Sequence, residues 1–211
     1  TVLVTGAGKR IGRTVASVLA QAGYHVVLHY NTSEEDCTAL KREIEAAGGK
    51  ASLVQADLND TESTSTLIER ASKATGLPLT ALINNASLFE EDHMGSLTPA
   101  LWQRHMSINT LAPLLLTQAF AAQLGALQSQ DGHPQNRPGH QHQAAAKGAV
   151  VNIIDQRVWR LNPHFMSYTA SKAALWALTQ TCAQALAPHV RVNAIGPGPV
   201  LASIHQSAAT F

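Results

Sequence analysis

A tyrosine and a lysine stand four positions apart in the sequence Tyr168-Thr-Ala-Ser-Lys172. On a helix this spacing is about one turn, so both side chains project from the same face. A tyrosine with an ordinary pKa near ~10 is a poor proton donor at neutral pH. A neighbouring ammonium group stabilises the phenolate and lowers that pKa. The pair therefore suits proton transfer in acid–base catalysis.

Two further polar residues give this pair its context, because a Tyr–Lys pair alone is common by chance. Asp155 stands thirteen positions before Tyr168, at the end of a predicted strand. Asn109 lies inside a long predicted helix. We interpret these residues as one candidate catalytic group, in which Asp155 could instead simply end its strand.

Glycines gather in the segment Thr5-Gly6-Ala-Gly8-Lys9-Arg10-Ile11-Gly12, between the first predicted strand and the first predicted helix. Glycines there allow a tight turn in which backbone N–H groups approach a pyrophosphate, and the helix N-terminus adds a positive dipole end. The spacing is not GxGxxG, so the context of strand, turn and helix carries the interpretation. The alternative is a glycine-rich turn that binds nothing.

The second predicted strand ends without the acidic residue that often holds the ribose hydroxyls of a dinucleotide. An adenosine 2′-phosphate is repelled by an acid and favoured by donors and cations, so we infer NADP(H) rather than NAD(H) as cofactor. Asp57, with Leu58 beside it, is expected at the adenine, or else is a turn residue. The 2′-phosphate donors are Lys9, Arg10, Asn31, Thr32 and Ser33, although Ser33 could only cap a helix and Arg10 only be solvated.

Strands and helices alternate along the chain, which predicts βαβ units and a parallel sheet with helices on both faces. The expected strands are Val2–Thr5, His25–Tyr30, Ala51–Ala56, Ala81–Asn84, Ala149–Ile154 and Val190–Ile195. The expected helices are Ile11–Ala22, Ser33 to Gly48, Asp60 to Thr75, Pro99 to Leu127 and Met166–Leu186.

Composition excludes several classes of protein. The chain has 211 residues, 45% of them hydrophobic, so it is not a disordered protein. Its net charge of +1 argues against binding to nucleic acid or a membrane surface through bulk charge. The cysteines Cys37 and Cys182 lie far apart, which fits a reducing compartment, and we expect a cytoplasmic location. Segment 128–147 is polar and aperiodic, and we interpret it as a flexible surface insert. It holds His133, His140 and His142, which lack the Cys or paired carboxylates of a metal site.

Taken together, these motifs resemble the short-chain dehydrogenase/reductase family over essentially the whole chain. The matching residues are Thr5, Gly6 and Gly12, Asp57-Leu58, Asn84-Asn85-Ala86, Asn109, Tyr168-x-x-x-Lys172 and Pro197-Gly198. The resemblance implies a single domain with the doubly wound Rossmann fold. It also implies hydride transfer between NAD(P) and a carbonyl, alcohol or C=N group.

Two departures from the common family pattern are similar to the pteridine reductase branch. Arg10 replaces a glycine of the turn, and Asp155 replaces the usual serine. The same branch carries His29-Tyr30-x-x-Ser33 and Asn84-Asn85-Ala86-Ser87-x-Phe89. The resemblance therefore implies NADPH-dependent reduction of a dihydropterin or dihydrofolate.

The resemblance assigns a role to each matching residue. Tyr168 donates the proton, Lys172 lowers the pKa of Tyr168 and holds the nicotinamide ribose, Asp155 assists at the pterin, and Asn109 keeps a helix bulge that serves Lys172. The substrate would contact Arg10, Ser87, Phe89, Asp155 and Tyr168, with Phe89 stacked on the pterin ring. The expected cofactor-binding residues are Gly6, Lys9, Arg10, Ile11, Gly12, His29, Tyr30, Asn31, Thr32, Ser33, Asp57, Leu58, Asn85, Ala86, Ser87, Tyr168, Lys172, Pro197 and Gly198.

Two alternatives stay open at this point. One is a reductase of the same fold that acts on a 3-oxoacyl thioester or a ketone, and the other is a non-catalytic NADP(H)-sensing protein. The family resemblance further implies a homotetramer and a final strand after Pro197-Gly198. Since the sequence ends at Phe211, we expect that strand and a substrate loop to be absent.

Overall fold

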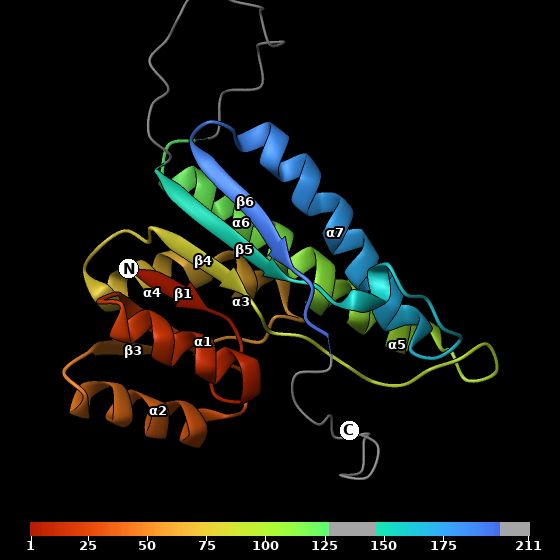
Figure 1. Cartoon of the computed structure of the whole chain (residues 1–211), viewed down its shortest axis with the longest axis horizontal. Coiled ribbons are helices and arrows are strands. Elements are labelled where there is room, and N and C mark those ends of the chain that lie inside the picture. Colours follow the sequence, from red (N-terminus) through yellow and green to blue (C-terminus); the bar gives the residue numbers. More distant parts are fainter. Residues whose placement is uncertain (127–146, 199–211) are drawn as a thin grey trace, which may run out of the picture.

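The centre of the protein is a parallel sheet of six strands in the order β3-β2-β1-β4-β5-β6, seen in a computed structural model (Figure 1). The structure describes residues 1–126 and 147–198. The strands are β1 (Val2–Val4), β2 (His25–Tyr30), β3 (Lys50–Gln55), β4 (Ala81–Asn84), β5 (Gly148–Ile153) and β6 (Val190–Ile195). This confirms the predicted doubly wound fold.

Successive residues of each strand supply opposite faces of the sheet. In β1, Val2 and Val4 pack with the helices α1 (Arg10–Gln21) and α2 (Glu34–Ala46), whereas Leu3 points into the second core. Because side chains alternate along a strand and both faces are covered, the strands are apolar on both sides. The second core is completed by α4 (Leu67–Thr75), α6 (Ala112–Gln123) and part of α7 (Met166–Leu186).

The prediction of one continuous helix from Pro99 to Leu127 is wrong. This segment consists of α5 (Pro99–Met106), a π-helix over Ser107–Leu111 and α6. Pro113 has no N–H to give to the carbonyl of residue 109, and its ring crowds that carbonyl. The wider π-turn accommodates both effects, and such turns are frequent at functional sites.

The predicted helix from Asp60 to Thr75 is also divided, into α3 (Thr61–Ser65) and α4. Asp60 caps α3 as its carboxylate accepts hydrogen bonds from the N–H groups of Glu62 and Ser63. At the break, the Thr66 hydroxyl bonds back to the carbonyl of Ser63. Hydroxyl side chains that bond to nearby backbone compete with the helical pattern, and we attribute the break to them.

The carboxyl ends of all strands meet at one edge of the sheet. β1 lies between β2 and β4, so the order in which the chain adds strands reverses beside β1. Parallel α/β sheets bind their ligands at this switch point. The predicted surface insert 128–147 and its histidines lie outside the described residues, apart from Lys147. The expected missing final strand concerns residues after Gly198, which also lie outside them.

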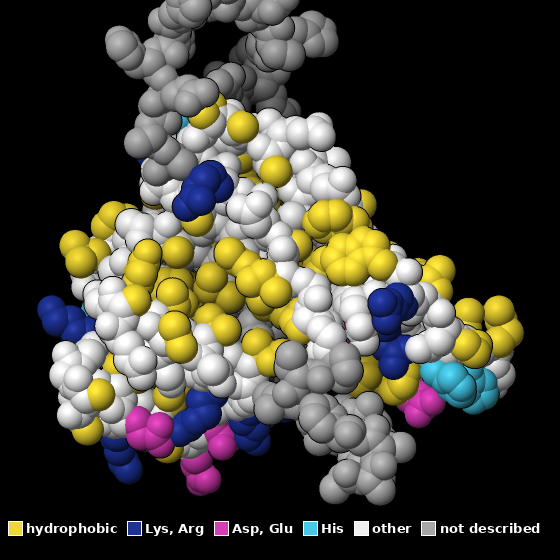
Figure 2. Space-filling model, in the orientation of Figure 1, with side chains coloured by type: hydrophobic (Ala, Val, Ile, Leu, Met, Phe, Trp, Pro, Cys, Tyr) yellow, Lys and Arg dark blue, Asp and Glu magenta, His cyan; other side chains and the backbone are white. Residues whose placement is uncertain are grey.

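Hydrophobic side chains gather on the face in Figure 2 over β6 and α7. The large hydrophobic residues exposed in the described part include Trp159, Leu161 and Ile195. Within the described residues, no helix is both long and apolar enough to cross a bilayer. The homotetramer stays a prediction.

Candidate active site

A cleft of about 790 Å³ lies along the carboxyl edge of the sheet. It is lined by every residue predicted to bind cofactor or substrate, and by Asp155, Tyr168 and Lys172. Asn109 does not line it. The structure therefore brings all of the predicted site residues except Asn109 together at one cleft.

The turn between β1 and α1 is held by close backbone packing. A Cβ atom added at Gly12 would stand 2.1 Å from the carbonyl oxygen of Gly6, a separation that no side chain tolerates. Gly6 has φ +63°, and Arg10 has φ 51° where the related turns carry glycine. The turn is therefore a cradle of backbone N–H groups at the start of α1, shaped for a pyrophosphate.

Polar side chains tie the end of β1 to the end of β4. The Thr5 hydroxyl accepts hydrogen bonds from the N–H groups of Asn85 and Ala86, both at 2.9 Å. The Asn85 amide donates in return to the carbonyls of Thr5 and Gly6. These contacts explain why threonine precedes the glycine turn and asparagine follows β4: they set the floor of the cleft.

His29 supports the glycine turn from beneath. Its ring is buried, with Nδ1 accepting from the Gly6 N–H at 3.1 Å and Nε2 donating to the Ala56 carbonyl at 3.1 Å. Both ring nitrogens are used in these contacts, so His29 positions Gly6, and its contact with the cofactor stays a prediction. Burial lowers the pKa of His29 to about 4, against the raising effect of the Ala56 carbonyl.

The buried neutral His29 makes stability depend on pH. Its pKa rises from about 4 in the folded protein to 6.5 in the unfolded chain, so the unfolded state takes up more protons as pH falls. Stability from this group is therefore complete above pH 6.5 and is lost as pH falls toward 4. Between about pH 7 and about pH 5 we expect a loss of ~2 kcal/mol in the free energy of unfolding.

Urea unfolding of His29→Gln at the same two pH values checks this prediction. Glutamine can accept from Gly6 and donate to Ala56, but it does not titrate. From about pH 7 to about pH 5, the free energy of unfolding of the variant should fall by about 2 kcal/mol less than that of the wild type. An equal pH dependence in both proteins would assign the acid sensitivity to other groups.

The residues after β2 that line the cleft, Asn31, Thr32 and Ser33, are donors and not carboxylates. Ser33 occupies the N-cap position of α2, yet its hydroxyl makes no capping hydrogen bond. Lys9 lies at the cleft, with its ammonium 3.1 Å from Asp36 and both side chains exposed. Asp57 accepts a hydrogen bond from the N–H of Asn59, as a turn residue does. It also lines the cleft.

The Tyr168 hydroxyl donates to Asp155 Oδ2 at 2.9 Å, and Lys172 Nζ donates to the Ile153 carbonyl at 2.8 Å. Tyr168 and Lys172 are almost wholly buried on one face of α7, and Asp155 follows β5. The ammonium lies 5.8 Å from the centre of the Tyr168 ring. The predicted one-turn spacing is thus confirmed, with the carboxylate at the phenol.

The protein's own groups raise the pKa of Tyr168, mainly through burial and then through the Asp155 charge, with Arg157 and Ser87 acting in the opposite direction. This differs from the expectation that Lys172 lowers that pKa. Burial lowers the pKa of Lys172 to about 8, while Asp155 acts to raise it. Tyr168 is therefore a neutral proton donor, and Lys172 can exchange a proton near neutral pH.

Asn109 lies in the π-helix, as the expected helix bulge requires, but its contacts differ from those of a catalytic residue. Its Oδ1 accepts from the Leu88 N–H at 2.8 Å, and its Nδ2 donates to the Leu88 carbonyl and to the Ser171 hydroxyl at 3.0 Å. The side chain is thus used in joining the loop after β4 to α7. Asn109 positions Ser87 and Leu88 at the edge of the cleft.

Phe89 stacks on Phe165, with ring centres 4.4 Å apart and an angle of 4° between the planes. Tyr168 meets Phe89 edge-on at 4.6 Å. We call Phe89 and Phe165 the aromatic wall of the cleft. The sequence did not identify Phe165, and the stacking predicted between Phe89 and a pterin remains a prediction.

Asp92 fixes the aromatic wall and the start of α7. It is buried, its carbonyl accepts from the Phe165 N–H at 2.7 Å, and its carboxylate accepts from the Ser167 N–H at 3.1 Å. Phe165 has a left-handed backbone with φ 57°, which is uncommon outside glycine. A carboxylate at a helix N-terminus also complements the helix dipole. Asp92 thereby sets the first turn of the helix that carries Tyr168.

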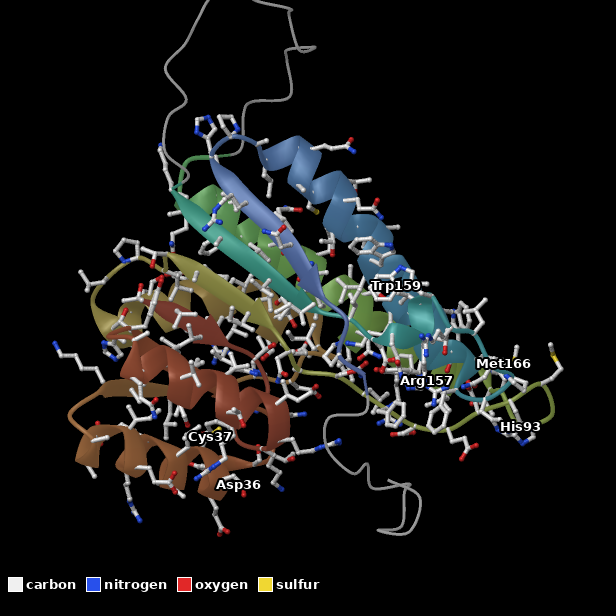
Figure 3. The ribbon with its side chains drawn as sticks, in the orientation of Figure 1. Asp36, Cys37, His93, Arg157, Trp159 and Met166 are labelled. Atoms are coloured by element: carbon white, nitrogen blue, oxygen red, sulfur yellow. The ribbon has the colours of Figure 1, made fainter. Side chains whose placement is uncertain are left out.

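Sequence reasoning missed several residues of the cleft near the catalytic pair. Most of them come from the loops after β4 and β5, where periodicity carries no signal, and the others come from α5, the π-helix and the end of β5. The missed residues are Leu88, Glu91, Arg104, Ile108, Ile153, Ile154, Gln156, Arg157 and Phe165. Figure 3 shows Arg157 beside the start of α7, near the labelled Trp159 and Met166.

Comparisons with known proteins agree with this geometry. The family model for short chain dehydrogenases matches residues 1–210. Dihydromonapterin reductase of Klebsiella pneumoniae is 33% identical over 200 residues, covering 95% of this chain and 74% of that protein. An uncharacterized oxidoreductase of Methylorubrum extorquens is 34% identical over 200 residues, covering 94% of this chain and 72% of its own.

A solved structure supports the same assignment. FolM alternative dihydrofolate reductase 1 from Brucella suis, in complex with NADP, is 43% identical with a TM-score of 0.85. The match covers 99% of this chain and 76% of that one. With Tyr168, Lys172 and the glycine turn in place at one cleft, the chain is an oxidoreductase that belongs to the short-chain dehydrogenase family.

Proposed function

We propose that the protein is an NADPH-dependent reductase of a pterin-type C=N bond, with dihydropterin or dihydrofolate as substrate. The observation that carries this proposal is the hydrogen bond between Tyr168 and Asp155, because it places a carboxylate where a hydroxyl usually stands. A carboxylate accepts from the amino and ring N–H donors of a pterin better than a hydroxyl does. The names of the similar FolM and dihydromonapterin reductases support the same substrate class.

The cleft fits an NADP-type cofactor. Gly6 and Gly12 permit the tight turn at the start of α1, and the residues at the end of β2 that line the cleft include no carboxylate. Arg10, Asn31, Thr32 and Ser33 suit a 2′-phosphate, while Lys172 and Tyr168 line the opposite end of the cleft. The solved structures of similar proteins hold NADP or NADPH. When bound, NADPH supplies the hydride that reduces the C=N carbon.

The residues of this chain manage the proton that the ring nitrogen must gain. Tyr168 is neutral, and its Oη lies 2.9 Å from Asp155 Oδ2. Oη is therefore the proton donor to the substrate. Asp155 is kept in place by the Arg157 N–H, which donates to Oδ1 at 2.8 Å and leaves Oδ2 toward the phenol. Lys172, with a pKa of about 8, stabilises the phenolate left behind and can return a proton to it.

The aromatic wall supplies a flat apolar surface next to Tyr168. Phe89 meets the phenol ring at 4.6 Å, and Phe165 supports Phe89 by stacking on it. A pterin is flat and aromatic, so packing against this wall orients its reducible bond toward Tyr168. Positioning of this kind contributes to the rate independently of the proton transfer.

The substrate class is tested by the loss of NADPH absorbance with dihydrobiopterin, dihydrofolate and acetoacetyl thioester in parallel. We expect turnover of both pterins, with NADPH preferred over NADH by at least about tenfold in kcat/KM. Reduction of the thioester without any pterin turnover would favour a carbonyl reductase. NADPH binding without turnover of any of the three would indicate a sensing protein.

A further inference from the structure

The side chain of Arg157 is a cation of the cleft with no counter-charge. Among residues 1–126 and 147–198, no carboxylate forms an ion pair with it. The neighbouring charges of the cleft are already paired: Arg104 meets Glu90 at 3.1 Å and Glu91 meets His164 at 3.0 Å. Arg157 thus differs from Arg104 and Glu91, which already have partners.

One nitrogen of the Arg157 guanidinium is left without a partner. Nη1 is buried and makes no hydrogen bond within the described part of the chain. A buried donor without a partner is costly, and a hydrogen bond to a charged acceptor is worth more than one to a neutral acceptor. The group therefore favours an incoming anion.

The platform under Arg157 is fixed. The guanidinium carbon lies 4.8 Å from the centre of the Phe165 ring, and Phe165 is held by the Asp92 carbonyl and by the stack with Phe89. A guanidinium stacked on a ring uses its face, and its N–H groups remain directed outward in the plane. Arg157 lines the cleft, so a ligand bound there can meet its side chain.

The position of Arg157 relative to Tyr168 defines which part of a substrate it can meet. Tyr168 contacts Phe89, Phe89 contacts Phe165, and Phe165 contacts Arg157. The guanidinium is thus linked to Tyr168 through two aromatic rings, while its charge still acts on the phenol. A substrate that reaches it carries its negative charge on a side chain rather than on the reacting ring.

We propose that Arg157 binds an anionic group on the side chain of the substrate, so that the enzyme prefers a pterin with a carboxylated tail, such as dihydrofolate, over a pterin with an uncharged tail. This inference rests on the proposed function and specifies its substrate. A planar guanidinium matches a carboxylate through two parallel N–H···O bonds. Loss of such a bond costs on the order of 10- to 100-fold in affinity.

The test compares dihydrofolate with dihydrobiopterin in the wild type, Arg157→Met and Arg157→Lys. We expect Arg157→Met to raise the KM for dihydrofolate by about tenfold or more. The KM for dihydrobiopterin should stay within about twofold, and the Kd of NADPH should not change. Arg157→Lys should raise the KM for dihydrofolate less than Arg157→Met does, because lysine keeps the positive charge but lacks the two parallel N–H groups of the guanidinium. Arg160→Met is the matched control, because Arg160 is exposed in the same loop and does not line the cleft.

A binding measurement separates this role from an effect on Tyr168. Calorimetric titration of folate and of biopterin into the enzyme with NADP⁺ should show a loss for folate alone in Arg157→Met. The wild-type affinity for folate should also weaken with added salt, more than that for biopterin. An equal fall in kcat for both pterins would overturn the inference, since Arg157 would then act through Asp155 and Tyr168.

Other outcomes are equally decisive. Unchanged constants for both substrates would overturn the inference while the proposed function stands. If the wild-type enzyme reduces neither pterin, the proposed function fails and this inference fails with it. A weaker Kd of NADPH in Arg157→Met would instead place Arg157 at the cofactor.

Discussion

Tyr168→Phe is expected to lower kcat by about 10²- to 10⁴-fold and to leave the Kd of NADPH within about threefold. The change removes one oxygen atom, which is the proton donor held 2.9 Å from Asp155. The ring stays, so its edge contact with Phe89 and the packing of α7 are kept. The proton required by the ring nitrogen then has no positioned source.

Rates come from the decrease in NADPH absorbance with dihydrofolate, and the Kd comes from NADPH fluorescence. Tyr24→Phe is the matched control, because Tyr24 is 39% exposed and does not line the cleft. The control should keep wild-type kcat. A Tyr168→Phe enzyme with more than about a tenth of the wild-type kcat would show that another group supplies the proton.

The agreement between sequence and structure is best where local signals and long-range packing coincide. The bounds of two elements were predicted to the residue: Met166–Leu186 and Ala81–Asn84. In each, the pattern of apolar residues along the sequence agrees with the packing in the fold. That Tyr168 and Lys172 share one helix face follows from their spacing. The glycine turn follows from its place between a strand and a helix.

The sequence could not reveal contacts between loops that are far apart along the chain. Phe165 and Phe89 are brought together only by folding, and Asp92 becomes a helix cap only because the loop after β4 lies against α7. Periodicity likewise cannot indicate that Asn109 joins two segments through every one of its amide atoms. The structure therefore shows positioning contacts of His29 and Asn109 that the sequence could not indicate.

Electrostatic expectations failed for a related reason. The lysine was expected to lower the pKa of Tyr168, since the two are one turn apart. The structure places a carboxylate closer to the phenol oxygen and directs Lys172 Nζ to the Ile153 carbonyl. Burial and the Asp155 charge then raise the pKa of Tyr168, which is opposite to the expected direction. Only the fold decides which of two neighbouring charges lies nearer.

Gly12→Ala is expected to weaken NADPH binding by at least about 100-fold, because the cradle at the start of α1 has no room for a methyl group. The added Cβ would stand 2.1 Å from the Gly6 carbonyl oxygen and 2.5 Å from Asn85 Nδ2. Backbone cannot move aside as a flexible side chain does, so the turn must open. Opening it separates Gly6 from His29 and from Asn85, which together hold the phosphate cradle.

A graded series of alanine variants tests this steric reasoning. At Gly8 the added Cβ would meet the Ser33 hydroxyl at 3.0 Å, and at Gly95 it would meet the His93 ring at 3.3 Å. Both neighbours are side chains, so Gly8→Ala should weaken NADPH binding by about tenfold at most and Gly95→Ala should not change it. Fluorescence titration gives the Kd, and thermal unfolding shows whether each variant is folded. A folded Gly12→Ala protein with wild-type affinity for NADPH would contradict the cradle as the cofactor site.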